Sequence, residues 1–287
     1  MLQVARLAPR SLGEEATARV ADFVAAAFDD AGGAVDRAGG VDLYYTVFAL
    51  DGLVALRRDL PSAATARWLE RFGAGDGLDL VHLACLARCW AAIDAAPDAG
   101  VRDGLTTALL RHRSADGGFA AEPGAERGGV YEAFLAHGAF EDLGVPLPDA
   151  ERLARSVLDA RCIDGGFARH PAAPEGVTTV TAAAVVLLRA LGTSAPDGVA
   201  DWLLARLHPQ GGFQAAPRTP IPDLLSTATA LHALACCGVD PGRWREPCLD
   251  FVDTLWTGRA FCGSWQDDVA DVEYTFYALL ALGHLAA

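Results

Sequence analysis

A short glycine motif returns six times along the chain, and this repeat constrains the fold more than any other feature of the sequence. Three copies are clear: Asp116-Gly117-Gly118-Phe119, Asp164-Gly165-Gly166-Phe167 and Gln210-Gly211-Gly212-Phe213. Three are looser: Ala31-Gly32-Gly33-Ala34, Gly75-Asp76-Gly77-Leu78 and Cys262-Gly263-Ser264-Trp265. Motifs at intervals of about 20–50 residues indicate stacked supersecondary units, each too small to bury its own apolar face. The sequence therefore predicts an array of six units.

Each unit contains two helix-like stretches, one on either side of the glycine motif. The first stretch has one apolar face and one polar face, which predicts an outer helix with a wet side. The second is apolar nearly all round, which predicts an inner helix that is covered or lines a cavity. The expected outer helices are 14–28, 62–72, 98–113, 148–161, 196–208 and 242–256. The expected inner helices are 42–56, 79–93, 129–140, 177–191, 223–237 and 271–285.

Capping residues mark both ends of several inner helices, and no segment carries a strand pattern. The expected caps are Asp42, Asp79, Asp223 and Asp271 at the starts and Gly192, Gly238 and Gly283 at the ends. The first and last inner helices share a Tyr-Thr-x-Phe/Tyr-Ala-Leu motif, beginning at Tyr45 and Tyr274. Neither end of the array has a polar capping repeat, which favours closure. We predict an all-α fold, an α/α toroid of six helical hairpins that spans residues 1–287 as one domain.

Composition excludes several classes of protein. The chain has 287 residues, 52% of them hydrophobic, and a net charge of −14, which disfavours a nucleic-acid partner. No apolar run is long enough to span a membrane and no secretory signal is evident, so we expect a cytoplasmic protein with reduced thiols. All 23 basic residues are Arg and Asn is absent. This usage is typical of a GC-rich genome and points to a bacterial source.

Gly-Gly-Phe followed by a capped apolar helix resembles the prenyltransferase β-subunit and squalene (terpene) cyclase superfamily, over essentially the whole chain from about residue 14. The segment from Asp116 to Tyr131 is similar to the β-subunits of protein farnesyl- and geranylgeranyltransferases. That family places a diphosphate-binding His where this chain has Arg127, and an Arg in the next repeat where this chain has Arg169 or His170. The resemblance therefore implies that these side chains hold a prenyl diphosphate. Each also fits the role of a solvated loop charge.

The zinc site of that family does not carry over. Its Asp-x-Cys and Asp-x-x-His motifs fall on Glu175-Gly176-Val177 and Asp223-Leu224-Leu225-Ser226, or, one repeat later, on Asp223-Leu224-Leu225 and Asp271-Val272-Glu273-Tyr274. Both registers lack the Cys and the His, so we expect no Zn²⁺ and no thiol prenylation. The segment from Asp79 to His82 has the second spacing but lies in another repeat.

Class II terpene cyclases protonate an alkene with an Asp-x-Asp-Asp motif, which is absent here. The nearest acidic group is Asp267-Asp268, followed by Asp271 and Glu273. Its Asp-Asp-x-x-Asp pattern resembles the magnesium–diphosphate motif of class I isoprenoid enzymes, although here it precedes a helix and equally fits a helix cap with first-turn charges. Asp267 and Asp268 are therefore the acidic candidates for Mg²⁺ binding or for protonation.

Aromatic residues on the inner helices complete the hypothesis. We expect Tyr44, Tyr45, Tyr274 and Phe276 to line an apolar centre, with charges at the rim where the inner helices begin; His232 and His284 are read as core residues. The leading hypothesis is an isoprenoid-handling enzyme, a prenyltransferase-like transferase or a terpene cyclase. Alternatives are a non-catalytic toroid that binds a lipid or a partner protein, and one half of a heterodimer with a second subunit. A centre filled by side chains would exclude the enzyme.

Overall fold

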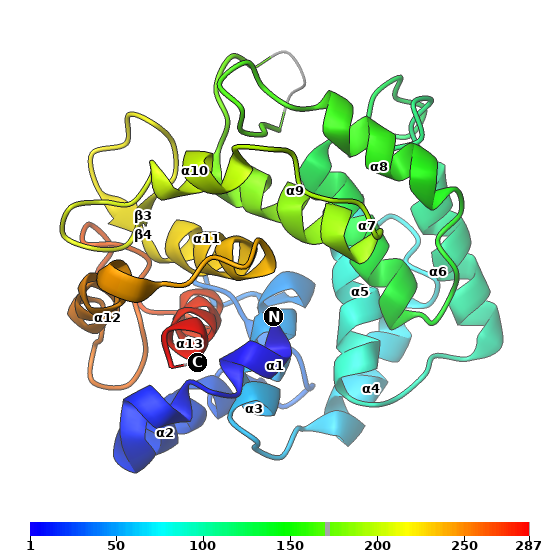
Figure 1. The fold of residues 1–287 in the computed structure, drawn as a ribbon. Coiled ribbons are helices and arrows are strands. Elements are labelled where there is room, and N and C mark those ends of the chain that lie inside the picture. Colours follow the sequence, from blue (N-terminus) through cyan, green and yellow to red (C-terminus); the bar gives the residue numbers. More distant parts are fainter. Residues whose placement is uncertain (170–172, 287) are drawn as a thin grey trace.

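A computed structural model describes residues 1–169 and 173–286. Two concentric layers of helices make up the fold (Figure 1). The inner layer contains α3 (Leu43–Ala55), α5 (Leu80–Ala92), α7 (Val130–Asp142), α9 (Thr178–Ala190), α11 (Leu224–Cys236) and α13 (Val272–Leu285). The outer layer contains α2 (Pro9–Ala25), α4 (Ser62–Leu69), α6 (Ala99–Arg111), α8 (Ala150–Asp159), α10 (Val199–Leu204) and α12 (Arg245–Thr254). Two single turns of 3-10 helix, Glu70–Phe72 and Gly242–Trp244, flank α4 and α12. The predicted all-α toroid of six hairpins is confirmed.

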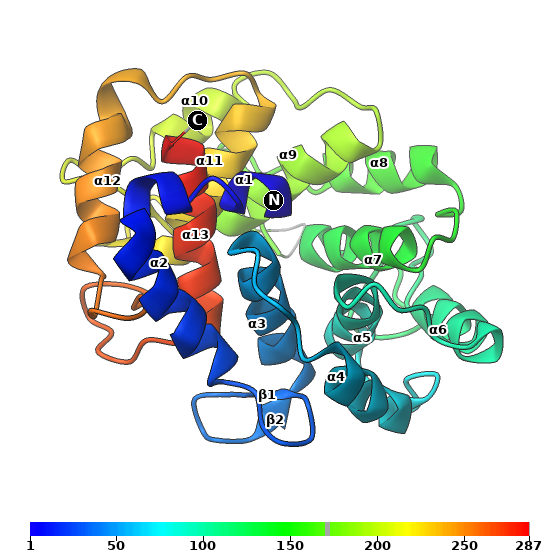
Figure 2. The ribbon, with the colours of Figure 1, turned by 90° about the horizontal axis from the view of Figure 1, so that it is seen from below.

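The inner helices form a closed ring. Each packs against the next in chain order, from α3 through α5, α7, α9 and α11 to α13, and α13 packs back against α3. Figure 2 shows α13 and α3 side by side although they lie at opposite ends of the chain. The shared motif of the first and last inner helices therefore correctly predicted that these two units are neighbours.

The predicted caps hold with one exception. The carboxylates of Asp42, Asp79, Asp223 and Asp271 each accept a hydrogen bond from the backbone N–H three residues later. Gly192 and Gly238 follow their helices with positive φ angles, as glycine caps do. Gly283 was predicted wrongly, because it lies inside α13 and not after it. Its lack of a side chain leaves room there for the backbone of Val4.

A buried threonine ties most inner helices to the turn that precedes them. In α9 the side-chain oxygen of Thr181 accepts a hydrogen bond of 2.9 Å from the backbone N–H of Phe167. Thr227 does the same for Phe213 at 2.9 Å. Thr46 and Thr275 repeat this contact in the first and last units. All four threonines are fully buried, so each bond satisfies a backbone donor that water cannot reach.

The same contact shows where the sixth motif truly lies. Thr275 accepts from the N–H of Phe261, and Phe261 pairs with Trp256 in the same way that Phe213 pairs with Leu207. The sixth turn is therefore Gly258-Arg259-Ala260-Phe261, and the sequence-based placement on Cys262–Trp265 is wrong. Gly258 has a positive φ, as the first glycine of the other turns does.

Short strands occur where none were predicted. Ala34–Val35 (β1) pairs antiparallel with Val41–Asp42 (β2), and Phe213–Gln214 (β3) pairs with Pro222–Asp223 (β4). Each pair is two residues long and joins the glycine turn to the start of the following inner helix. Segments this short carry no alternating pattern of polar and apolar residues, so they could not be predicted from the sequence.

An additional helix, α1 (Leu2–Ala5), precedes the first unit. No helix within residues 1–169 and 173–286 is long and apolar enough to cross a membrane. All seven cysteines lie within this part of the chain and are free.

Gly211 precedes the turn phenylalanine Phe213 by two residues and Gly258 precedes Phe261 by three, and both have a positive φ, +86° and +91°. A Cβ added to Gly211 would lie 1.8 Å from the carbonyl oxygen of Pro247, whereas one added to Gly258 has no atom within 4 Å. We expect Gly211→Ala to lower the free energy of unfolding by about 3–5 kcal/mol and Gly258→Ala by about 1–2 kcal/mol. Urea unfolding followed by circular dichroism measures both, and equal losses would contradict this account.

Candidate functional site

A cavity of about 440 Å³ lies at the centre of the toroid. All six inner helices contribute to its wall, and most of the lining side chains are aliphatic or aromatic. The second residue of five of these helices reaches it: Tyr44, Val81, Tyr131, Thr179 and Leu225. The centre is therefore not filled by side chains, and an apolar central cavity is what the sequence predicted. Its volume falls within the range of small-ligand pockets, about 300–1,000 Å³.

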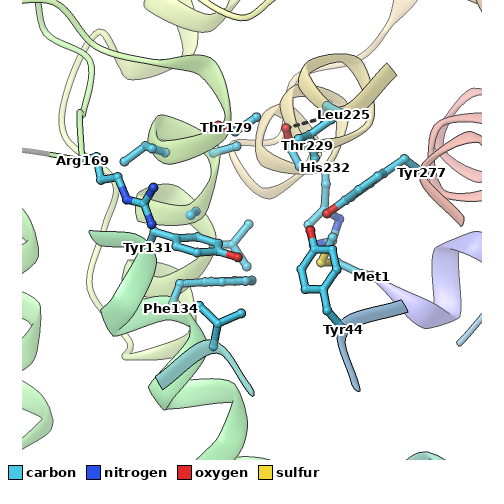
Figure 3. Close-up of a pocket in the computed structure, with 15 residues that line it drawn as sticks. Met1, Tyr44, Tyr131, Phe134, Arg169, Thr179, Leu225, Thr229, His232 and Tyr277 are labelled. Atoms are coloured by element: carbon cyan, nitrogen blue, oxygen red, sulfur yellow. Dashed lines mark hydrogen bonds between the residues drawn. The ribbon is translucent and has the colours of Figure 1, made fainter. Parts of the chain in front are cut away.

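The cavity runs along the inner helices from their first turns inward. On α11 its lining begins at Leu225 and continues through Thr229 to His232. His232 lies seven residues after Leu225, which corresponds to about 10 Å of helix rise. At the deep end the side chain of Met1 joins the lining, and Figure 3 shows it beside Tyr44 and His232. The cavity is thus an elongated space with a polar mouth and an apolar interior.

One cation stands at the mouth. Arg169 follows the fourth glycine turn and lines the cavity, with its side chain 60% exposed. Its guanidinium lies 5.6 Å from the centre of the Tyr131 ring and 3.5 Å from a carboxylate oxygen of Glu132. These contacts hold the guanidinium beside the aromatic wall and leave donors free toward solvent. Arg169 can therefore meet an anionic group of a ligand whose chain lies in the cavity.

A carboxyl group sits behind the opposite wall. The hydroxyl of Tyr44 donates a hydrogen bond of 2.7 Å to Oε1 of Glu273, in the first turn of α13. Burial raises the pKa of Glu273 above its ordinary value, and the bond from Tyr44 opposes that rise only in part. Burial likewise raises the pKa of Tyr44. Since Tyr44 lines the cavity, this pair connects a protonatable carboxyl with the cavity interior.

Aromatic rings surround that pair. Tyr44 meets Phe48 edge-on with ring centres 5.0 Å apart, and Phe48 meets Tyr277 at 5.4 Å. Figure 3 shows Tyr44 and Tyr277 facing Tyr131 and Phe134 across the cavity. The electron-rich faces of such rings attract cations, including carbocations. The wall therefore suits a reaction in which positive charge develops on a hydrocarbon.

Two histidines close the deep end of the same wall. Nδ1 of His232 lies 2.9 Å from Nε2 of His284, which joins α11 to α13. Burial lowers the pKa of His232 to about 3 and that of His284 to about 4. Both rings are therefore neutral near pH 7. The sequence-based interpretation of both as core residues missed that His232 reaches the cavity.

The structure brings only part of the predicted site to the cavity. Arg169 lines it, but Arg127 is exposed on the preceding glycine loop and does not. His170 lies outside the described residues. Tyr45 does not line the cavity, because it follows Tyr44 directly and residues adjacent in a helix point about 100° apart. On α13 the cavity is lined by Tyr277, one turn beyond Tyr274, and neither Tyr274 nor Phe276 lines it.

The acidic pair lies in the turn before α13 and does not line the cavity. Asp267 forms an ion pair of 2.8 Å with Arg37, which belongs to the first unit. Arg37 also binds the carboxylate of Asp271 at 2.5 Å and the carbonyl of Val269 at 2.9 Å. The bonds from Arg37 lower the pKa of Asp267, so its carboxylate stays ionised. These contacts join the two ends of the ring, while a catalytic role for Asp267 and Asp268 stays a prediction.

Within residues 1–169 and 173–286, no three His, Cys, Asp or Glu side chains come together as a possible metal site. His82 instead contacts two helix caps, with Nδ1 2.8 Å from Asp79 and Nε2 3.4 Å from Asp42. The use of Mg²⁺ or Zn²⁺ stays a prediction.

Sequence reasoning missed the paired position of Glu273 and Tyr44. Both are the second residue of their inner helices, as are four of the other lining residues. Alignment of the helices by their caps would have brought this position out as the one that faces the mouth.

Removal of the Arg37 side chain tests the ring contact. Asp271 is 6% exposed and would lose its cation, so we expect Arg37→Met to lower the free energy of unfolding by about 1–3 kcal/mol. The exposed pair of Arg19 with Glu15 provides the control, and Arg19→Met should cost less than about 0.5 kcal/mol.

The Arg37 effect should also depend on pH in a defined direction. The folded pKa of Asp267 lies below its ordinary value, so this contribution is present above the ordinary value and is lost as the pH falls through the lowered one. Urea unfolding at several pH values measures it. If the stability lost in Arg37→Met increased toward low pH, the assignment of this stability to the ion pair of Arg37 with Asp267 would be wrong.

Comparisons with known proteins agree with this architecture. A family model described as "Prenyltransferase alpha-alpha toroid domain" matches residues 79–146, 130–207 and 181–286. These overlapping matches cover the chain from the second inner helix to the last. A comparison with curated proteins gave no match.

Solved structures with the same arrangement include two kinds of enzyme. The type II terpene cyclase MstE from Scytonema has a TM-score of 0.64 at 13% identity, over 99% of this chain and 98% of the other. A variant of that cyclase bound to its substrate, geranylgeranyl dihydroxybenzoate, has a TM-score of 0.62 at 14% identity, over 99% and 97%. Protein geranylgeranyltransferase-I from Candida albicans has a TM-score of 0.51 at 14% identity, over 97% and 82%. At these identities the likeness establishes a shared fold.

Proposed function

The chain belongs to the prenyltransferase alpha-alpha toroid domain family, and on this basis we propose that it is an isoprenoid-handling enzyme. The observation that carries the proposal is the open cavity in the ring, with apolar and aromatic walls contributed by all six inner helices. A cavity of this kind removes a hydrocarbon chain from water without requiring polar partners for it. The cyclase from Scytonema, which shares the fold, is described with a geranylgeranyl-bearing substrate.

The polar head of the ligand lies at the mouth in this proposal. Arg169 is the cation that lines the cavity there, and its guanidinium is oriented by Tyr131 and Glu132. The inner helices begin at the same mouth, and their N-termini add partial positive charge there. A prenyl diphosphate fits this arrangement, with its oxygens on Arg169 and its chain in the cavity.

We assign the acid of the reaction to Glu273. A carboxyl group with a raised pKa keeps its proton closer to neutral pH, and Tyr44 links this one to the cavity. At an oxygen–oxygen distance of 2.7 Å, a protonated Glu273 can itself donate to the Tyr44 oxygen, which leaves the hydroxyl proton of Tyr44 free to point into the cavity. The pair can therefore deliver a proton to an alkene that lies against the Tyr44 ring.

The Tyr44 hydroxyl gives its proton to one alkene carbon, the alkene π pair forms the new C–H bond, and the other carbon becomes a carbocation. Glu273 passes its own proton to the Tyr44 oxygen and is left as a carboxylate. Ring closure uses the π pair of a second alkene, loss of a proton ends the sequence, and solvent reprotonates Glu273. The rings of Phe48 and Tyr277 stabilise the positive charge meanwhile.

A thermal shift assay tests the binding site. Farnesyl and geranylgeranyl diphosphate, each present about a hundredfold above its Kd, should raise the Tm by roughly 4–5 °C. In Arg169→Ala the affinity for the diphosphates should fall by about 10- to 100-fold, while that for the corresponding alcohols stays unchanged. The same replacement at Arg127, which the sequence also suggested, serves as the matched control.

Two outcomes of this assay would count against the proposal. A chain that gives no shift with any diphosphate or alcohol is a toroid that binds something other than isoprenoids, such as a partner protein. Equal losses in the two Arg variants would remove Arg169 as the head-group residue and leave a general charge effect.

Incubation with geranylgeranyl diphosphate in D₂O tests the chemistry. Alkene protonation places one deuterium on the protonated carbon, which mass spectrometry of the product detects. Glu273→Gln keeps a hydrogen-bond acceptor for Tyr44 but removes the acidic proton, so we expect the rate to fall by about 10²–10⁴-fold. The rate should also fall as the pH rises through the raised pKa of Glu273, because only the protonated carboxyl is active.

The variant Asp268→Asn tests the rival assignment at the turn before α13. We expect it to keep the wild-type rate, since this side chain does not line the cavity. A full rate in Glu273→Gln together with a loss in Asp268→Asn would transfer the acid role to the acidic turn.

A further inference from the structure

The first eight residues lie across the end of the ring that is opposite the glycine turns. Figures 1 and 2 show α1 against α13 and α3, inside the circle of outer helices. Its contacts are with those two inner helices. Ala5 and Ala8 are completely buried there. We refer to residues 1–8 as the N-terminal plug.

The plug reaches the cavity through a single side chain. Met1 lines the cavity together with His232 and Tyr44. Met1 has 36% of its surface exposed, and it is one of the residues that line the cavity. A flexible thioether adapts to irregular apolar surfaces, which suits the end wall of a hydrocarbon site. The length of the cavity is therefore limited by a segment that belongs to none of the six hairpins.

Gly283 seats the plug on α13. A Cβ added at this position would lie 2.1 Å from the carbonyl oxygen of Val4 and 3.2 Å from Cα of Ala5. Both atoms belong to the backbone of α1, so a side chain there cannot be accommodated by a rotamer change. The close approach of the two helices thus depends on the glycine that interrupts the apolar sequence of α13.

The plug is connected to the remainder of α2 through a break in the helix. Gly13 has φ of +75° and ψ of 172°, and no atom lies within 4 Å of a Cβ added there. A break in open space lets the segment before it shift without displacing α2. Displacement of the plug is therefore separable from the packing of the hairpins.

We propose that the N-terminal plug sets the maximum length of hydrocarbon chain that the cavity accepts, with Met1 as its end wall. This inference rests on the proposed isoprenoid function for the nature of the natural chain. The geometry itself applies to any linear hydrocarbon that enters from the mouth. Residues 1–8 are then specificity determinants, although Met1 is the one residue among them that lines the cavity.

The test compares Gly283→Ala with Gly138→Ala. Gly138 also lies within an inner helix, α7, but a Cβ added there has no atom within 4 Å. Both variants gain helix propensity, so the matched pair isolates the contact with α1. A third variant lacks residues 2–8 and has no plug at all.

Two homologous series of ligands measure the cavity by isothermal titration calorimetry. One contains farnesol, geranylgeraniol and geranylfarnesol, and the other contains straight-chain alcohols of increasing length. In the wild type and in Gly138→Ala, affinity should rise with length and then stop rising at the same member. In Gly283→Ala and in the truncated chain, the affinity for the next longer alcohol should be about tenfold higher than in the wild type. This increase is a fraction of the binding free energy that burial of further methylene groups can contribute.

The outcomes separate this inference from the proposed function. An unchanged length limit in Gly283→Ala, or in the truncated chain where that variant folds, would overturn the inference even if prenyl alcohols bind. Binding of straight chains but of no prenyl alcohol, with the limit shifted as expected, would overturn the isoprenoid function and support the role of the plug. A wild type that binds neither series would overturn both.

Discussion

The packing of α13 against α3 is the contact on which the cavity depends, because it turns a row of hairpins into a ring. Arg37 reinforces it from the first unit by binding Asp267, Asp271 and the carbonyl of Val269 in the last. The hydrogen bond from Tyr44 to Glu273 spans the same junction. An open row would expose the apolar inner helices to water, whereas a ring leaves only a central space to be lined. The proposed acid therefore sits at the seam where the two ends of the chain meet.

The ring also separates polar from apolar chemistry along its axis. The glycine turns and the starts of the inner helices lie at one end, where Arg169 and Glu273 are found. The remaining wall consists mostly of aliphatic and aromatic side chains, and Met1 of the N-terminal plug lines the far end. Buried threonines hold four of the turns in register with their helices. A ligand with a charged head and a long apolar tail matches this gradient in one orientation only.

Much of the fold could be predicted because the same local pattern is repeated. Helical periodicity placed all twelve hairpin helices, and Asp42, Asp79, Asp223 and Asp271 cap inner helices as expected. The errors arose where a residue type has two uses. Gly283 resembled a helix end but serves a close helix contact, and Gly263 resembled a turn glycine although Gly258 holds that position. A glycine in sequence does not reveal whether it provides a positive φ angle or room for a neighbour.

The candidate site was less accessible from the sequence. The resemblance to prenyltransferase β-subunits suggested Arg127 and either Arg169 or His170; of the two arginines, Arg169 lines the cavity and Arg127 stays on the surface. By itself, the sequence determined the number of units, the helices, their caps and the apolar character of the centre, because these follow from local periodicity. Only the tertiary structure decided which residues meet in the cavity. Tyr44, Glu273 and Met1 come from distant parts of the chain, and ring closure and the seating of α1 bring them together.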